Sequence, residues 1–313
     1  MLIYIVRRIV VSLPILLTVL TLVFLLVRLA PGDPAVAALG DYASQEAVER
    51  MRERMGLNAP LWLQYVRFLG QLVRGDLGHS LINNVPVSQQ IKRVLPYTLE
   101  LTAAGILVGL LFGIPLGIAT ALRRNTLIDY LGRIFGLTGL SVPAFYLGIL
   151  LMLLFSVQLN WFPVVGGGDL TDLGDNLRHL CLPALSLGLI MTAYVARMTR
   201  SALLAVLNED YIRTARSKGL PERLVLLRHA LRTALIPVVS VVGVYSIVLI
   251  GSSVMTEVVF SRPGLGKLMV GAMKQRDYTT LQSIMVIYAS FVVIINLLTD
   301  LAYGIIDPRI RYQ

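Results

Sequence analysis

Charged residues are scarce in this chain: only 15% of its 313 residues are Asp, Glu, Lys or Arg. A typical soluble domain holds about 25%. Hydrophobic residues instead make up 56% of the sequence. This balance excludes a water-soluble globular protein of this length, and it predicts a polytopic membrane protein built from apolar helices.

Residues that carry chemistry are few as well. The single cysteine, Cys181, cannot form a disulfide within the chain, and the three histidines lack metal-ligand spacing. The run Gly264-Leu265-Gly266-Lys267 lacks the upstream glycine of a phosphate-binding P-loop, and Leu268 stands where that motif needs a hydroxyl. No nucleophile–base pattern stands out. We therefore expect no enzyme, and no metal or cofactor bound by this chain.

Six segments are long and apolar enough to cross about 30 Å of hydrocarbon. They are Ile9–Leu29, Thr98–Leu122, Ile134–Ser156, Leu180–Met198, Leu235–Glu257 and Leu281–Ile305. The first run exceeds the h-region of a signal peptide, so a retained helix is expected. The predicted organisation is an N-terminal helix (1–29), an ordered extracytoplasmic helical segment (30–97) and a five-helix core (98–313) with a cytoplasmic loop at 199–235.

Basic residues set the expected orientation. With the N-terminus inside, the inner segments hold most of the Arg and Lys of the short loops, including all eight basic residues from Arg197 to Arg232. Because cytoplasmic loops are enriched in Arg and Lys, both termini are predicted to be cytoplasmic. The net charge of +10 lies in loops beside apolar runs and not in a soluble basic domain, so nucleic acid is not an expected partner.

The basic segment Asn208–Pro237 is too elaborate for a simple connection between two spans. It is predicted to form two short helices joined at Gly219, with Asn208 capping the first and Pro221 opening a second that runs to Leu235. A structured cytoplasmic elbow indicates a docking site. The residues predicted to couple to a partner there are Glu209, Asp210, Tyr211, Ile212, Arg213, Ala215, Arg216, Lys218 and Gly219.

The fifth span is the richest in hydroxyl groups and is not expected to face lipid all round. Its polar side chains either line a solute path or form hydrogen bonds between helices. The candidates for the path are Tyr245, Ser246, Ser252, Ser253 and Glu257. Ser246 and Ser253 lie two helical turns apart and are predicted to face a central cavity. Glu257, like Glu100, is also interpretable as an anchor at the membrane interface.

Small residues and prolines mark other features. The second span carries Gly105, Gly109, Gly113 and Gly117 on one face, which suits close helix packing within the chain or an interface with a sister subunit. Pro115 and Pro143 allow local kinks. The segment 30–97 contains an amphipathic helical pattern, Leu61–Val73, and is interpreted as a lid on the bundle or as a receiver of a partner or solute.

The run Glu209–Gly219 (EDYIRTARSKG) resembles the coupling-loop motif of ABC-importer permeases. Further landmarks resemble the first permease subunit of the dipeptide/oligopeptide/nickel family, with dipeptide and glutathione importer permeases most similar in appearance. They are Pro31-Gly32-Asp33-Pro34, Met55–Pro60, Gly75-Asp76-Leu77-Gly78, Phe260–Gly266 and Ile306–Arg311. The general motif has Glu-Ala-Ala where this chain has Arg213-Thr214-Ala215, and Pro237 comes later than the usual proline.

The resemblance implies a type I ABC-importer permease fold, all-α with six spans, in a bacterial cytoplasmic membrane. Its implied partners are a second homologous permease, two ATP-binding subunits that hold ATP and Mg, and an extracytoplasmic substrate-binding protein that delivers a peptide-class solute. Tyr211, Ile212 and Ala215 would form the packed face of the coupling helix, and Arg213, Arg216 and Lys218 would pair with acidic residues of the ATPase.

Other readings of the sequence stay open at this point. Nickel or metal-chelate importers of the same family have similar permeases. An ion-coupled secondary transporter would need ionisable residues at mid-membrane, which are nearly absent, and ATP dependence of uptake would separate it. An intramembrane enzyme would need a catalytic constellation, and none is visible.

Overall fold

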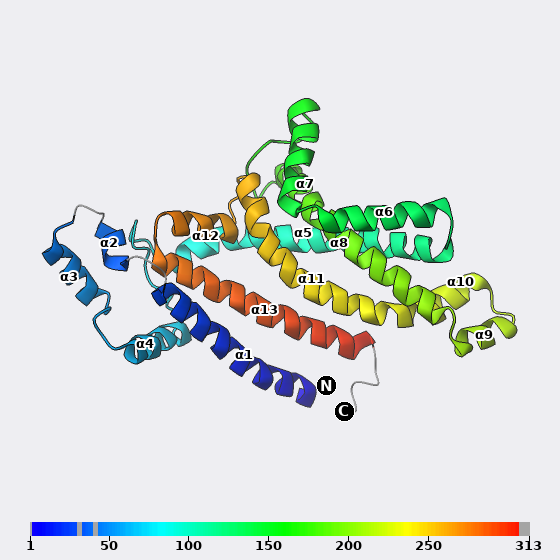
Figure 1. Cartoon of the computed structure of the whole chain (residues 1–313), viewed down its shortest axis with the longest axis horizontal. Coiled ribbons are helices and arrows are strands. Elements are labelled where there is room, and N and C mark those ends of the chain that lie inside the picture. The colour runs from blue at the N-terminus through cyan, green and yellow to red at the C-terminus, as the bar shows by residue number, and fades with distance from the viewer. Residues whose placement is uncertain (1, 30–32, 40–42, 307–313) are drawn as a thin grey trace. The chain divides into compact units, whose positions relative to one another are not determined.

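A computed structural model describes residues 2–29, 33–39 and 43–306, and within these ranges the chain is helical with no β-strand. The predicted all-α class is therefore confirmed. In chain order (Figure 1), the elements are α1 (Leu2–Leu29), α2 (Pro34–Leu39), α3 (Gln45–Arg54), α4 (Leu61–Val73), α5 (Val87–Leu122), α6 (Leu127–Ser141), α7 (Ala144–Leu151), η1 (Met152–Gln158), α8 (Leu173–Val206), α9 (Asp210–Ser217), α10 (Glu222–Leu224), η2 (Val225–Ala230), α11 (Leu231–Val259), α12 (Leu265–Lys274) and α13 (Tyr278–Ile306). The two η elements are π-helical.

Within the described residues, five helical stretches are long and apolar enough to cross a membrane, and their bounds exceed the predicted ones at most ends. They are Val10–Leu29, Val87–Leu122, Leu173–Val206, Glu222–Val259 and Tyr278–Ala302. The helix α8, for example, begins seven residues before the predicted Leu180, because Asp172 accepts hydrogen bonds from the N–H groups of Gly174 and Asp175. Polar first turns of this kind are invisible to a hydropathy window.

The third predicted span, Ile134–Ser156, is not one straight helix. It is a pair, Leu127–Ser141 and Ala144–Gln158, bent by 106° at the break, and counting the pair as one span gives six. Pro143 adopts φ −63° and ψ 143°, and Val142 before it is extended as well. Proline disfavours the helical region for the residue that precedes it, so α6 ends there. Pro115, by contrast, leaves α5 continuous.

The described residues divide into two compact units. The first comprises those of Met1–Arg8, Leu99–Arg262 and Ile294–Gln313, and the second those of Ile9–Thr98 and Pro263–Val293. The boundaries predicted at residues 29 and 97 follow the order of the chain, whereas the second unit combines an early and a late part of it. The helices α1, α5 and α13 contribute residues to both units.

The first unit is organised around α8, which contacts α6, α7 and α11. The glycine stripe of α5 also lies against it. A Cβ at Gly105 would meet Leu187 at 3.2 Å, one at Gly109 would meet Met191 at 2.2 Å, and one at Gly113 would meet Val195 at 2.7 Å. Both partners advance by four residues, so the two helices run in close register. Packing of this stripe within the chain is confirmed.

The second unit holds α4 against α1 and α13. The Phe24 ring stacks on Phe68 with centroids 5.7 Å apart, and Val286 joins the cluster that contains Leu20 and Val23. In the loop after α1, Asp33 accepts a 2.7 Å hydrogen bond from Arg52. Partial burial of the carboxyl raises its pKa, but the hydrogen bonds and the charge of Arg52 outweigh it and lower the pKa of Asp33 below the usual value.

The glycine stripe gives a stability test at Gly117. A Cβ there would lie 2.5 Å from Cβ of Thr199 and 2.7 Å from the backbone oxygen of Ala196, which cannot rotate away. We expect Gly117→Ala to destabilise the chain by about 1–3 kcal/mol, as overpacking does. The matched control is Gly136→Ala on α6, where a Cβ meets nothing within 4 Å. Thermal unfolding in detergent should show a lower Tm for the first variant alone, and equal Tm values would contradict the close packing.

Candidate functional site

The elbow between α8 and α11 begins with the short helix α9, and a second helical stretch starts just after Pro221, as predicted. Asn208 does not cap α9: its Nδ2 donates to the Leu204 oxygen at 3.0 Å and so closes α8, while Glu209 occupies the cap position without a side-chain hydrogen bond. Gly219 has φ +78°, the left-handed conformation predicted for it. The expected end of this second helix at Leu235 is wrong, because the helical stretch that begins at Glu222 continues through η2 into α11.

The inner face of α9 packs on the chain itself. Ile212 is completely buried and Ala215 is 7% exposed, in a cluster with residues of α5, α8, η2 and α11. The other members are Ala121, Leu203, Val206, Val225, Ala230 and Ala234. The expectation that Ile212 and Ala215 share a partner-facing surface with Tyr211 is therefore wrong. A short helix with an apolar stripe must bury it, and its own permease domain lies nearest.

The outer face of α9 is polar and charged. Tyr211 is 43% exposed, and the side chains of Arg213 and Asp210 are 71% and 96% exposed. Glu209 and Lys218 are exposed too. Arg216 is already engaged, because its Nε donates to Glu222 at 3.0 Å across the Gly219 turn, and this hydrogen bond raises the pKa of the guanidinium. Arg213 pairs with Asp210 at 3.4 Å and the Tyr211 hydroxyl donates to Thr233 at 3.2 Å, but these side chains stay exposed. The exposed surface of the elbow thus includes Glu209, Asp210, Tyr211, Arg213 and Lys218.

Most of the pathway candidates on α11 are buried within the chain. Ser246 is 5% exposed, and Ser253 and Glu257 have no exposed surface. The Ser246 hydroxyl donates to the Val242 oxygen at 2.7 Å, and that of Ser253 to the Ile250 oxygen at 2.8 Å. The prediction that these two serines face an open cavity is wrong. Their hydroxyls are satisfied by their own helix, a common arrangement for serine in apolar helices, and not by another helix.

Tyr245 and Ser252 do reach a hollow. Tyr245 stacks on Tyr194 of α8 with ring centroids 3.5 Å apart, and the Arg197 guanidinium carbon lies 5.7 Å from the centre of the Tyr194 ring. Both tyrosines and Ser252 line a cavity of about 70 Å³ together with Val248. The exposed face of α11 beside it is apolar, and it consists of Val244, Val248, Gly251, Met255 and Val258. Because this face carries no hydroxyl group, the hydroxyl pattern of the sequence could not predict it.

A buried ionic network joins α5, α8 and the end of α11, and it was not anticipated. Arg262 has no exposed surface, and its Nη2 donates to Glu100 Oε2 at 2.5 Å. Its Nη1 donates to the Gly167 oxygen at 2.9 Å, and Asn176 donates its amide to the other oxygen of Glu100. Glu100 is therefore an ion-pair partner and not an interfacial anchor. The fully buried Glu257 is no interfacial anchor either.

A second network ties α6 to α8. The buried carboxylate of Asp129 accepts from Arg200 at 2.7 Å and 2.9 Å, and from Arg133 at 3.0 Å. The Asn125 N–H donates to it at 3.0 Å. The sequence did contain a sign of the Asp129–Arg133 ion pair, because Asp129 is an acidic residue four positions before Arg133 on one helix.

The Glu100–Arg262 pair can be tested by removing one charge. Arg262→Met leaves Glu100 without its guanidinium partner, and breaking a buried pair costs about 3–5 kcal/mol. We expect a clear fall in Tm for this variant, and partial recovery in the double variant Arg262→Met with Glu100→Met. Arg178→Met, at an exposed position of α8, is the matched control. A Tm unchanged by Arg262→Met would show that the buried pair does not hold the three segments together.

Comparisons with known proteins agree with this architecture. A family model described as "Binding-protein-dependent transport system inner membrane component" matches residues 113–312, and its N-terminal companion matches residues 1–102. Among solved structures, an inward-facing methionine ABC transporter, MetNI, has a TM-score of 0.55 at 20% identity, covering 70% of this chain and 97% of its own. An amino acid ABC transporter has a TM-score of 0.54 at 18% identity, covering 69% and 94%. At these identities the likeness shows the fold alone.

Relatives of known description match along their whole length. The glutathione transport system permease GsiC of Salmonella paratyphi A is 43% identical over 100% of both chains. The oligopeptide transport system permease AppB of Bacillus subtilis is 42% identical over 99% of both, and the dipeptide transport system permease DppB of Alkalihalophilus pseudofirmus is 38% identical over 100% of both. With a membrane-helical fold and both family models matched, the chain belongs to the binding-protein-dependent transport system inner membrane components, the permease subunits of ABC importers.

Proposed function

We propose that this permease moves short peptides across a bacterial cytoplasmic membrane by alternating access, driven by ATP hydrolysis on two partner subunits. The observation that carries the mechanism is the placement of α9, whose apolar side packs against α5, α8, η2 and α11 while its charged side stays open. The peptide class is supported by relatives named for glutathione, dipeptide and oligopeptide transport at 38–43% identity over nearly their full length.

In this mechanism α9 acts as a lever. Interiors packed to high density transmit displacement because they cannot compress. A movement of α9 imposed by an ATPase must therefore shift Ile212 and Ala215, and with them the ends of the helices that hold Leu203 and Ala234. The surface that an ATPase touches is the open set around Tyr211, Arg213 and Lys218. ATP and Mg belong to that partner.

The solute path is proposed to follow the exposed face of α11 and the Tyr194–Tyr245 pair. A second permease of the same kind would complete the path, since one copy leaves Val248 and Met255 uncovered. An extracytoplasmic binding protein would deliver the peptide, and both termini of the chain would lie in the cytoplasm. The positive charge of the α8–α11 elbow supports this orientation.

Charge reversal on the open face of α9 tests the dock. Arg213→Glu should weaken association with the ATPase subunits about tenfold or more, because like charges placed against each other at an interface cost several kcal/mol. Co-purification of ATPase with the tagged permease, and ATP-dependent peptide uptake, should both fall while the Tm of the permease stays unchanged. Arg178→Glu, the same charge reversal at an exposed position of α8, serves as the matched control.

The inner face of α9 should behave differently from the open one. Ile212→Asp buries a carboxylate without a partner, so the Tm of the permease itself should drop.

The docking assignment would be refuted if Arg213→Glu left ATPase co-purification and uptake as in the unmodified protein.

The path is tested with bulky side chains on α11. Val248→Trp enlarges a half-exposed side chain beside the tyrosine pair and should slow uptake at least severalfold, with ATPase binding and Tm retained. Ser253→Trp should lower the Tm, because that position has no free space. Leu111→Trp, on the exposed side of α5, is the control for a large exposed aromatic. Normal uptake by the Val248 variant would place the path on other helices.

A further inference from the structure

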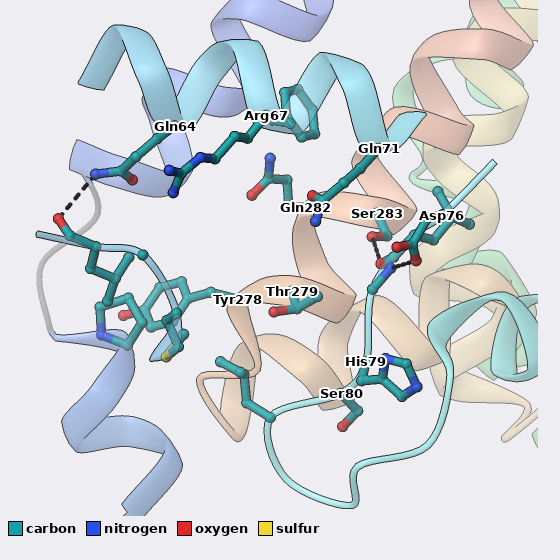
Figure 2. A pocket seen from close by; sticks show the side chains of 18 of the residues that line it. Gln64, Arg67, Gln71, Asp76, His79, Ser80, Tyr278, Thr279, Gln282 and Ser283 are labelled. Carbon is teal, nitrogen blue, oxygen red and sulfur yellow. Dashed lines mark hydrogen bonds between the residues drawn. The ribbon is translucent and has the colours of Figure 1, made fainter. Parts of the chain in front are cut away.

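The second unit contains a polar cavity of about 520 Å³ that the transport mechanism above does not use. Its walls come from α3, α4, the Gly75–Leu81 loop and the first turns of α13 (Figure 2). Pockets of roughly 300–1,000 Å³ are typical of small-molecule sites. The volume therefore suits a ligand of a few residues and exceeds what a single trapped water needs.

The amide of Gln282 is the most telling group in this cavity. Gln282 is 9% exposed, and no hydrogen bond to its side chain occurs within the described ranges. Its amide atoms keep some accessible surface, so the unpaired amide opens into the cavity and is available to a ligand. Figure 2 shows it directed into the space between α4 and α13. One acceptor and two donor positions are thus held ready inside the pocket.

Two opposite charges flank this amide. Arg67 points from α4 into the cavity, and Asp76 lies on the other side of Gln282 in Figure 2. Arg67 has no ion pair within the described part of the chain. Asp76 uses Oδ1 to accept from the Gly78 N–H at 2.9 Å, which leaves Oδ2 available. Gln71 lies on α4 between them in the same view and adds a second unbonded amide.

Other polar groups of the pocket are committed to building its walls. The Gln64 amide donates to the oxygens of Leu57 and Ala59 at 3.0 Å and 2.8 Å and accepts from Arg28 at 2.9 Å. The Ser283 hydroxyl donates to the Leu77 oxygen at 2.8 Å. The wall groups are therefore fixed by hydrogen bonds, while the exposed Arg67, Gln71 and Asp76 and the buried Gln282 keep open hydrogen-bonding positions at the cavity. That division is typical of a preformed binding site.

We infer that this cavity binds a short peptide with free termini. Arg67 would pair with the terminal carboxylate, for which a guanidinium offers two parallel donors. Asp76 would pair with the terminal ammonium. Gln282 and Gln71 would bond the peptide groups between them, and each offers both a donor and an acceptor, as a backbone amide requires. The apolar side chains of Met51, Met55 and Phe68 leave room for side chains of several shapes.

This site rests on the proposed function for its place in transport. On that orientation, the segment 30–97 lies outside the cytoplasm, so the pocket would hold peptide on its way from the binding protein to the path. These contacts select peptides by their two charged termini and not by one side chain. The permease itself would then prefer peptides whose termini are both free.

Binding is measured on the full-length chain in lipid nanodiscs without ATPase, by calorimetric titration with trialanine. The comparison ligands are trialanine amide, which lacks the carboxylate, and N-acetyl-trialanine, which lacks the ammonium. We expect saturable binding of trialanine, weakened about tenfold by either blocked terminus, as loss of a charge-assisted hydrogen bond does.

Variants assign the contacts. Arg67→Gln should bind trialanine about tenfold more weakly and should no longer distinguish it from the amide. Asp76→Asn keeps the oxygen that accepts from Gly78 and should remove the preference for a free amino terminus. Gln282→Leu should weaken all three ligands. Arg74→Gln, one position past α4 and outside the cavity, is the control that should leave binding unchanged.

The inference is overturned if trialanine shows no saturable binding, if blocked and free peptides bind equally, or if Arg74→Gln weakens binding as much as Arg67→Gln. Each of these results can occur while ATP-dependent uptake persists, in which case the proposed function stands and the pocket assignment alone fails. Loss of ATP dependence with peptide binding intact would reject the proposed function instead.

Discussion

The close approach of α5 and α8 is the contact on which the first unit depends. Glycines four apart on α5 leave room for Leu187, Met191 and Val195, and a Cβ at Gly109 or Gly113 would lie 2.2 Å or 2.7 Å from its partner. With the two backbones this near, α8 becomes the central helix, and α6, α7 and α11 pack around it. It is one continuous helix of 34 residues. The Asn176 network at its start and the α9 elbow after its end are therefore attached to a single rigid element.

Polar groups in this apolar unit follow one rule. The fully buried Asp129 pairs with Arg200, and the fully buried Arg262 pairs with Glu100. The buried serines of α11 bond to carbonyls of their own helix. Unpaired charges in such surroundings would cost several kcal/mol each, which explains the arrangement. Removing one residue of a pair leaves the other charge unpaired at that cost. These pairs therefore fix which helices stay together, even though their net contribution to stability is small.

Hydropathy and local turn chemistry were enough to predict the helical class, most span positions and the left-handed Gly219. They could not predict which side of α9 faces outward, because an apolar stripe at helical spacing reads the same whether it meets a partner or its own domain. Ile212 shows this directly. The break at Pro143 was visible as an allowed kink, but its 106° bend depends on tertiary packing. The Arg262 pair joins residues 162 positions apart, which no local pattern records.

The character of the exposed α11 face bears on how a peptide importer chooses its cargo. Val244, Val248 and Met255 offer apolar surface and no hydrogen bonds, so a path along them cannot recognise the termini of a peptide. A smooth apolar surface suits solutes whose side chains vary, because it binds none of them strongly enough to stop release. Selection must then come from polar groups elsewhere. In this chain one such group of polar side chains, Arg67, Gln71, Asp76 and Gln282, lines the cavity of the second unit.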